Sequence, residues 1–187
     1  TQTRELVFFN SLKPGIHLIK VDSITMKSLP NVRFEFKLVG GSYRQEFTTD
    51  VNGEIDLSKL TPGAYEVREL EAPDGYLIDD AVRVVQVNPD ENANFVFTNT
   101  PKPSLRLIKT SSDGTRLGGV HFRIARIEDG THYLDRITDD NGEINISNLE
   151  PGVYSVKETA TVADHILDLQ EYHVELFPGQ TSTITIE

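Results

Sequence analysis

The sequence predicts an all-β protein built from two tandem antiparallel β-sandwich domains. Apolar and polar residues alternate in short runs, as in strands with one buried face, and Asn-Gly, Pro-Gly and Asp-Gly turns separate the runs. The same landmarks recur 89 positions apart, among them Gly53 with Gly142 and Tyr65 with Tyr154. A repeat of that length indicates two copies of one domain of about 85 residues, each with seven short strands.

Alternation identifies the strands in order along the first repeat. In residues 16–22 the even positions are apolar up to Lys20, and in residues 64–70 the odd positions continue to Glu69. In residues 94–99 the alternate apolar positions end at Asn99. The shorter runs between turn signals predict the other strands, at residues 32–38, 44–48, 53–57 and 82–88.

Boundaries between the repeats follow from the same offset. Residues 1–13 are expected to be the last strand and linker of a preceding repeat, so the chain is interpreted as a slice of a longer protein. The first domain should span 14–100, the linker 101–104, and the second domain 105–187. Two prolines favour an extended linker. Only the stretch Thr161–Gln170 has a pattern that could hold a helical turn.

Composition excludes several functional classes. The chain has no cysteine, which removes disulfides, thiolate metal sites and a cysteine nucleophile. The formal charge of -11 argues against binding nucleic acid or anionic lipid, and no apolar run is long enough for a membrane span. The N-terminal residues do not form a signal peptide.

No metal or cofactor is expected from the sequence. The histidines show no ligand spacing and are interpreted as surface or edge residues; they are His17, His121, His132, His165 and His173. Loops 50–54 and 139–143 resemble fragments of a calcium loop but lack its 12-residue ligand spacing. Asn-Gly hairpin turns are the favoured interpretation of both loops.

Three polar residues occupy strand positions that the alternation marks as buried: Lys20, Glu69 and Asn99. Burying an amine, a carboxyl and a carboxamide without partners costs several kcal/mol. The favoured hypothesis is a covalent bond between the lysine and the asparagine. The alternatives are a buried hydrogen-bonded network, or a surface salt bridge if the strand register differs by one residue.

The set recurs incompletely in the second repeat. Lys109 and Glu158 repeat the first two members, but the third would fall at position 188, beyond the last residue of the chain. Position 188 is expected to be asparagine in the parent protein. Within this chain, a buried ion pair is the alternative to a second cross-link. Asn10 precedes Asn99 by the same 89 positions and is interpreted as the cross-linking asparagine of the preceding repeat.

The first repeat resembles the Cna protein B-type (CnaB, prealbumin-like, reverse immunoglobulin-like) repeats of Gram-positive surface adhesins and pilins. The motifs that carry the resemblance are Leu18-Ile-Lys-Val-Asp22, Thr49-Asp-Val-Asn-Gly53, Leu60-Thr-Pro-Gly-Ala-Tyr65, Glu69-Leu-Glu-Ala-Pro-Asp-Gly-Tyr76 and Phe97-Thr-Asn-Thr100. The resemblance implies that Lys20 attacks the Asn99 carboxamide to form an intramolecular isopeptide bond with loss of ammonia. It implies that Glu69 is the catalytic residue that assists.

The resemblance also implies a function and a location. We expect a structural stalk or spacer module of an adhesin, outside the cell and attached to the wall of a Gram-positive bacterium. The alternatives are pilin shaft domains, or a module that binds host matrix or carbohydrate. Expected partners are neighbouring repeats of the same chain, and host matrix through other domains; the fragment is expected to be a monomer. No enzyme acting on an external substrate is expected, because the reaction is single-turnover and consumes its own residues.

Overall fold

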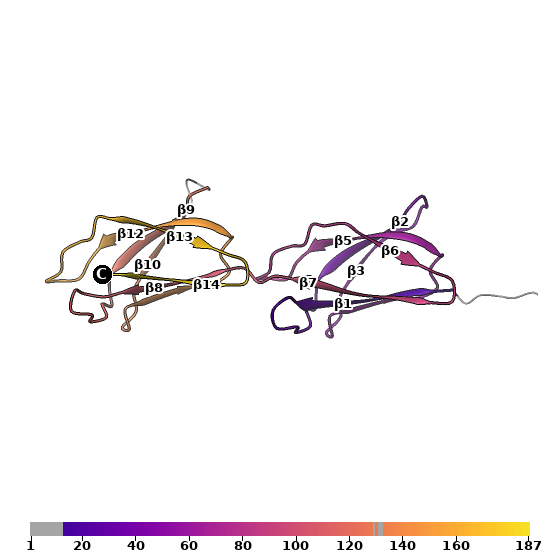
Figure 1. The fold of residues 1–187 in the computed structure, drawn as a ribbon, viewed down its shortest axis with the longest axis horizontal. Helices are drawn as coiled ribbons and strands as arrows, with labels where there is room; N and C mark the ends of the chain where they lie inside the picture. Colours follow the sequence, from indigo (N-terminus) through magenta and orange to yellow (C-terminus); the bar gives the residue numbers. More distant parts are fainter. Residues whose placement is uncertain (1–12, 129, 131–132) are drawn as a thin grey trace, which may run out of the picture. The chain divides into compact units, whose positions relative to one another are not determined.

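A computed structural model describes residues 13–128, 130 and 133–187 of the chain (Figure 1). The described residues form fourteen strands and no helix, and they divide into two compact units. The first unit holds residues up to Pro73 together with Ile78–Asn99; the second holds Asp74–Leu77 together with Thr100–Glu187. Of the strand and linker predicted at residues 1–13, residues 1–12, including Asn10, lie outside the described residues.

Each unit has seven strands in the same order. Those of the first unit are β1 (Gly15–Asp22), β2 (Arg33–Leu38), β3 (Arg44–Thr48), β4 (Glu54–Leu57), β5 (Gly63–Glu71), β6 (Arg83–Val87) and β7 (Asn92–Asn99). Those of the second unit are β8 (Ser104–Lys109), β9 (His121–Arg126), β10 (Tyr133–Ile137), β11 (Glu143–Ile146), β12 (Gly152–Ala160), β13 (Glu171–Leu176) and β14 (Thr181–Ile186). The predicted strands of the first repeat agree with these bounds to within two residues.

Each unit is a sandwich of a three-stranded and a four-stranded sheet. The first unit has the orders β4-β1-β7 and β3-β2-β5-β6, and the second has β11-β8-β14 and β10-β9-β12-β13. All pairs are antiparallel except β1 with β7 and β8 with β14, which are parallel. Parallel neighbours need a long connection, and here the connection is the rest of the domain.

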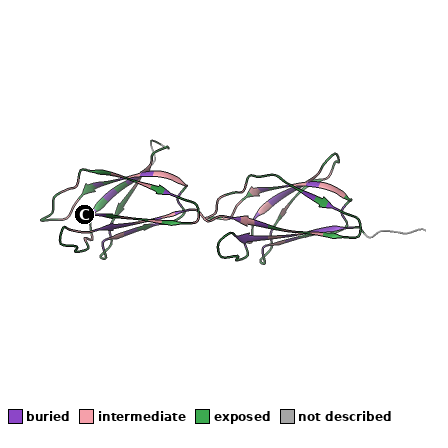
Figure 2. Cartoon of the chain, viewed as in Figure 1, coloured by how far each residue is buried: buried purple, intermediate pink, exposed green. Residues whose placement is uncertain are grey.

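Each sandwich has its own apolar core (Figure 2). Phe34, Phe36 and Tyr65 are among the largest fully buried side chains of the first unit. Phe122 and Ile124 belong to the equivalent core of the second unit. On most strands more exposed positions alternate with buried ones, the pattern from which the fold class was predicted, although Glu35 between Phe34 and Phe36 is buried as well.

Two local expectations are wrong. The stretch Thr161–Gln170 contains no helix; it forms a turn in which the His165 amide donates to the Val162 carbonyl. The Asn-Gly turns do not close hairpins, because β3 and β4 lie in opposite sheets. The chain instead crosses between sheets at loop 50–54, where the Asp50 carboxylate accepts the Asn52 and Glu54 amides.

None of the described elements is a helix long and apolar enough to span a bilayer.

Candidate cross-linking site

The three predicted site residues of the first domain meet between its two sheets. Lys20 lies on β1 and Asn99 at the end of β7, the neighbouring parallel strand, while Glu69 projects from β5 of the opposite sheet. Their exposed fractions are 0%, 1% and 3%, so all three are buried, as the alternation predicted. The register pairs Lys20 with Phe97 and Asp22 with Asn99, so the lysine and asparagine share one face, two positions apart.

Glu69 connects the other two side chains. The Lys20 ammonium donates to Glu69 Oε2 at 2.7 Å, and the Asn99 carboxamide nitrogen donates to Glu69 Oε1 at 2.6 Å. Both bonds involve an ionised group and are short, as such bonds usually are. The carboxylate therefore lies within hydrogen-bonding distance of both groups that the hypothesis would join.

Apolar walls surround this network. Lys20 Nζ lies 5.5 Å from the centre of the Phe34 ring, and that ring packs edge-on against Phe97 with centroids 5.3 Å apart. Burial lowers the pKa of the Lys20 amine below its usual 10.5, although the hydrogen bond and charge of Glu69 act in the opposite direction. The site thus favours the neutral, nucleophilic form of the lysine more than water does.

A pair that sequence reasoning missed lies beside the site. The Arg83 guanidinium sits 4.5 Å from the centre of the Phe97 ring and donates to Asp79 at 2.6 Å. The Asp79 charge raises the pKa of Lys20 and the Arg83 charge lowers it, so the two act in opposite directions. The signal available in the sequence was the 89-residue offset, which pairs these residues with Asp168 and Tyr172, also joined by a hydrogen bond.

The motif Thr49–Gly53 holds the backbone of the lysine in place. The Lys20 amide donates to the Gly53 carbonyl at 2.7 Å. Gly53 has a φ of 76°, and a Cβ there would lie 2.6 Å from the Lys20 carbonyl oxygen, so only glycine is accommodated. The buried Thr49 hydroxyl donates to the Leu29 carbonyl and accepts the Val32 amide, which anchors the loop that follows β1.

The second domain repeats the glycine turn beside its lysine, but its buried site has fewer hydrogen bonds. Gly142 has a φ of 70°, and its carbonyl accepts the Lys109 amide at 2.8 Å. Lys109 Nζ lies 3.2 Å from Glu158 Oε2, but neither carboxylate oxygen of Glu158 has a hydrogen bond among the described residues. The pair is nevertheless buried, with exposed fractions of 4% and 3%.

Strand register shows which position of the second repeat would correspond to Asn99. Ile186 of β14 pairs with Lys109, just as Phe97 pairs with Lys20. The position equivalent to Asn99 is therefore 188, one residue beyond Glu187, and the structure agrees with the offset found in the sequence. Within this chain the second site is a buried ion pair.

The fold of both domains matches a known protein family. The family model of the SpaA prealbumin-like fold domain matches residues 14–101 and again residues 103–187. The chain therefore belongs to this family and contains two copies of its domain, which confirms the fold class predicted from the sequence.

Individual relatives are distant. The Bacillus anthracis TIE protein is 25% identical in sequence, with a TM-score of 0.50 over 95% of this chain and 34% of that one. A shaft pilin, SpaA of Lactobacillus rhamnosus GG, shares the fold at 13% identity, with a TM-score of 0.51 over 94% of this chain and 97% of that one. Colossin-A of Dictyostelium discoideum is 26% identical over 151 residues, 70% of this chain and 1% of that protein. The chain thus spans a small part of the TIE protein and of colossin-A.

Proposed function

We propose that this chain is a stalk or spacer module of a bacterial surface adhesin, stabilised by a self-formed isopeptide bond between Lys20 and Asn99. The observation that carries the proposal is the buried Glu69 carboxylate, which hydrogen-bonds both the amine and the carboxamide. A stable fold gains little from three buried polar groups that apolar residues could replace. Their arrangement is explained by a reaction between them.

The geometry supports a complete proton route for that reaction. A proton moves from the Lys20 ammonium to Glu69 along the 2.7 Å hydrogen bond, leaving a neutral amine. The amine attacks the carbonyl carbon of the Asn99 side chain. Glu69 Oε1 lies 2.6 Å from the carboxamide nitrogen, where it can deliver the proton that the leaving group needs.

Atoms and charges balance in this scheme. The C–N bond of the carboxamide breaks, and a new C–N bond joins Lys20 Nζ to the same carbon. Two of the three ammonium protons are given up: one leaves with ammonia, and one remains on Glu69, which ends as a neutral acid. Folding holds the reactants in contact, so no cofactor or external reactant is required. The chain is in this sense not an enzyme, because each molecule reacts once.

The topology suits a protein under tension. The chain enters the first domain at the start of β1 and leaves it at the end of β7, and these strands are parallel neighbours. Pulling on the two ends therefore shears the whole β1–β7 ladder instead of opening it pair by pair. With Lys20 bonded to Asn99, the force passes from one strand to the other through a covalent bond, and residues 21–98 carry none of it.

The proposed setting follows from this role. We place the module outside a Gram-positive cell, attached to its wall as part of a longer protein, with neighbouring repeats as its partners and no oligomer required. Host matrix would be contacted by other domains. A non-reducible cross-link is useful there because the chain has no cysteine with which to form a disulfide.

Intact-mass spectrometry tests the bond. The purified chain should be lighter than its sequence predicts by one ammonia, and peptide mapping should find Lys20 joined to Asn99. Lys20→Ala, Asn99→Ala and Glu69→Ala should each restore the full mass. Asn94→Ala, an exposed asparagine on the same strand, is the matched control and should keep the deficit. A wild-type chain of full mass would refute the cross-link.

A pilin shaft is the second candidate, since one solved structure with this fold is a shaft pilin. The same mechanical argument applies to both roles. Immunogold electron microscopy with antibodies against this chain separates them: a stalk would label the cell periphery, whereas a shaft would label regularly along filaments.

A further inference from the structure

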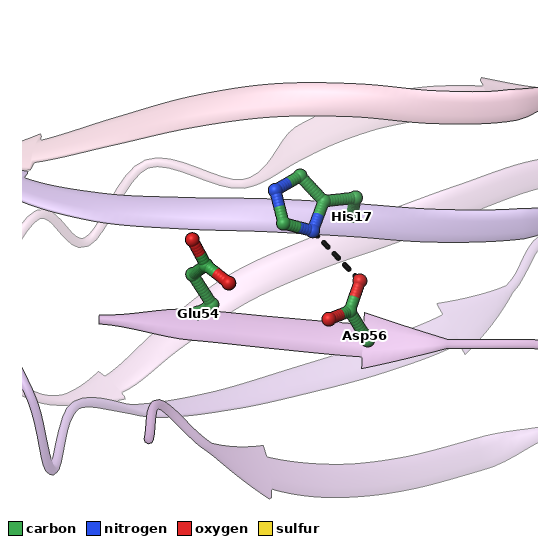
Figure 3. A group of neighbouring side chains, drawn as sticks. All are labelled: His17, Glu54 and Asp56. Carbon is green, nitrogen blue, oxygen red and sulfur yellow. Dashed lines mark hydrogen bonds and ion pairs between the residues drawn. The ribbon is translucent and has the colours of Figure 1, made fainter. Parts of the chain in front are cut away.

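Three potential metal ligands meet on the outer face of the β4-β1-β7 sheet (Figure 3). His17 lies on β1 and Glu54 and Asp56 on β4, where His17 pairs directly with Asp56 and Ile19 with Glu54. One ligand atom from each side chain lies within 4.8 Å of the other two. His17 Nδ1 and Asp56 Oδ1 are already 2.7 Å apart. The sequence did not reveal this group because the histidine and the carboxylates come from strands almost forty positions apart.

The second domain has an ion pair at the equivalent place on its sheet. The equivalent residues are Arg106, Glu143 and Asn145, in the same register. Arg106 binds Glu143 through two contacts, one of them 2.9 Å from Nε to Oε2, and Asn145 is a further neighbour of that carboxylate. Arg116 Nη1 also lies 3.5 Å from Glu143, so arginines neutralise this carboxylate, and an arginine offers no lone pair to a metal.

The first domain differs at two of these three positions. A histidine replaces the arginine, and an aspartate replaces the asparagine. The first change removes the cation and introduces an imidazole, while the second adds a carboxylate. Among the described residues, neither Glu54 nor Asp56 forms a salt bridge with lysine or arginine. Two carboxylates thus lie beside an imidazole without a lysine or arginine paired to them in the part of the chain that the structure describes.

We propose that His17, Glu54 and Asp56 bind a divalent transition-metal ion, with zinc as the representative. One imidazole and two carboxylates form a ligand set that borderline ions accept, whereas magnesium and calcium prefer oxygen ligands alone. Ligand atoms of a tetrahedral zinc ion lie roughly 3.3–3.5 Å apart, given bonds of about 2.0–2.2 Å. The carboxylates reach this spacing by side-chain rotation, because Asp56 is 74% exposed. Water completes the coordination.

Such an ion would join two strands that the isopeptide bond does not link. β4 is a four-residue strand at the edge of its sheet, and among the described strands it pairs with β1 alone. The metal would tie β4 to β1, as the proposed Lys20–Asn99 bond ties β1 to β7. The metal site does not depend on that bond, because His17 faces away from the core that contains Lys20.

Two paired variants test the site by exchanging it between the domains. In His17→Arg with Asp56→Asn, the first domain receives the residues of the second, an arrangement already compatible with this fold. In Arg106→His with Asn145→Asp, the second domain receives those of the first. Isothermal titration with zinc chloride should find one ion per wild-type chain, none for the first variant and two for the second. The thermal midpoint of the wild type should rise with zinc concentration, and the rise should be lost in the first variant.

A residue-specific measurement distinguishes metal binding at His17 from binding at the other histidines. Sub-stoichiometric copper(II) should broaden the ring signals of His17 in an NMR spectrum before those of His121, His165 or His173. His173, which lies 3.7 Å from Glu171, is the control, and His173→Asn should leave the zinc stoichiometry unchanged. Zinc uptake that is absent in the wild type, or equal in the wild type and in His17→Arg with Asp56→Asn, would overturn the proposal. Magnesium chloride should give no titration signal.

Discussion

The two domains share one frame but differ at the buried site. In the first, Glu69 hydrogen-bonds Lys20 and Asn99 at 2.7 and 2.6 Å. In the second, Lys109 and Glu158 stand 3.2 Å apart, and the carboxylate makes no hydrogen bond among the described residues. The surrounding glycine turn, threonine anchor and parallel strand pair are the same in both.

The shared features belong to the fold, whereas the difference lies in the residues proposed to react. The second domain has the same strand order and an equivalent apolar core, with Lys109 and Glu158 as the members of its site. What Asn99 adds is a partner for the second oxygen of the carboxylate and an electrophile for the lysine. We expect the two domains to fold alike and to differ in what happens after folding.

The largest expected effect is mechanical. In single-molecule pulling from the two ends, the wild-type chain should show one unfolding event, from the second domain, because the bond locks the first. Asn99→Ala should show two events, and its first domain should lose roughly 4 to 5 kcal/mol on the chain-entropy account of a loop of about 80 residues. Asn94→Ala should behave as the wild type. Two events from the wild type would contradict a closed bond.

A second bond should be obtainable by extending the chain. Appending Asn-Thr after Glu187, the pair found at positions 99 and 100, supplies the third member at position 188. We expect the mass to fall by a second ammonia and the second domain to gain a similar roughly 4 to 5 kcal/mol. Appending Ala-Thr is the control. A single deficit in the Asn-Thr chain would mean that the Lys109 site is not competent.

Removal of one member of the second site should be costly, and removal of both should not. Lys109→Ala leaves the buried Glu158 carboxylate unpaired and should destabilise the second domain by about 3–5 kcal/mol. Lys109→Met with Glu158→Leu should recover this loss, because apolar groups replace the whole pair. Domain-resolved hydrogen exchange measures both. Equal losses from the single and double variants would show that the pair stabilises the domain.

The pH dependence of the unlinked first domain tests the state of its lysine. In Asn99→Ala, the folded pKa of Lys20 is expected to remain below the unfolded value near 10.5, since its main cause, burial, is retained. Just below that value the unfolded chain then binds more protons than the folded chain, so the free energy of unfolding should rise as the pH approaches 10.5 from below. Urea unfolding at several pH values measures it. Asn99→Ala with Lys20→Met should lack this rise. An equal rise in both variants would show that groups other than Lys20 cause it.

The smallest effect should be the same in both domains. Tyr65 donates its hydroxyl to the Thr61 carbonyl at 3.0 Å, and Tyr154 donates to the Glu150 carbonyl at 2.9 Å. Tyr65→Phe and Tyr154→Phe should each cost about 0.5–1.5 kcal/mol. Hydrogen exchange should report equal changes in β5 and β12. Clearly unequal losses of stability would show that the two domains differ more around this tyrosine than their geometry indicates.

Much of the first site could be predicted from the sequence because strand alternation has a period of 2. That period places Lys20, Glu69 and Asn99 on buried faces, and the 89-residue offset identifies the incomplete set in the second domain. The helical turn expected at Thr161–Gln170 was wrong, since Ile166 and Leu169 are exposed and have no packing that would stabilise a helix there. The hairpins expected at the Asn-Gly turns were wrong because a turn motif does not state which sheet the next strand joins.

The sequence by itself determined the fold class, the strands, the repeat and the residues of the buried site, because these depend on local alternation and on spacing along the chain. Only the tertiary structure decided which strands are neighbours. It made β1 and β7 a parallel pair, set the Glu69 carboxylate between Lys20 and Asn99, and brought His17 to Glu54 and Asp56. Contacts between distant strands depend on sheet order and register, and no local pattern in the chain encodes either.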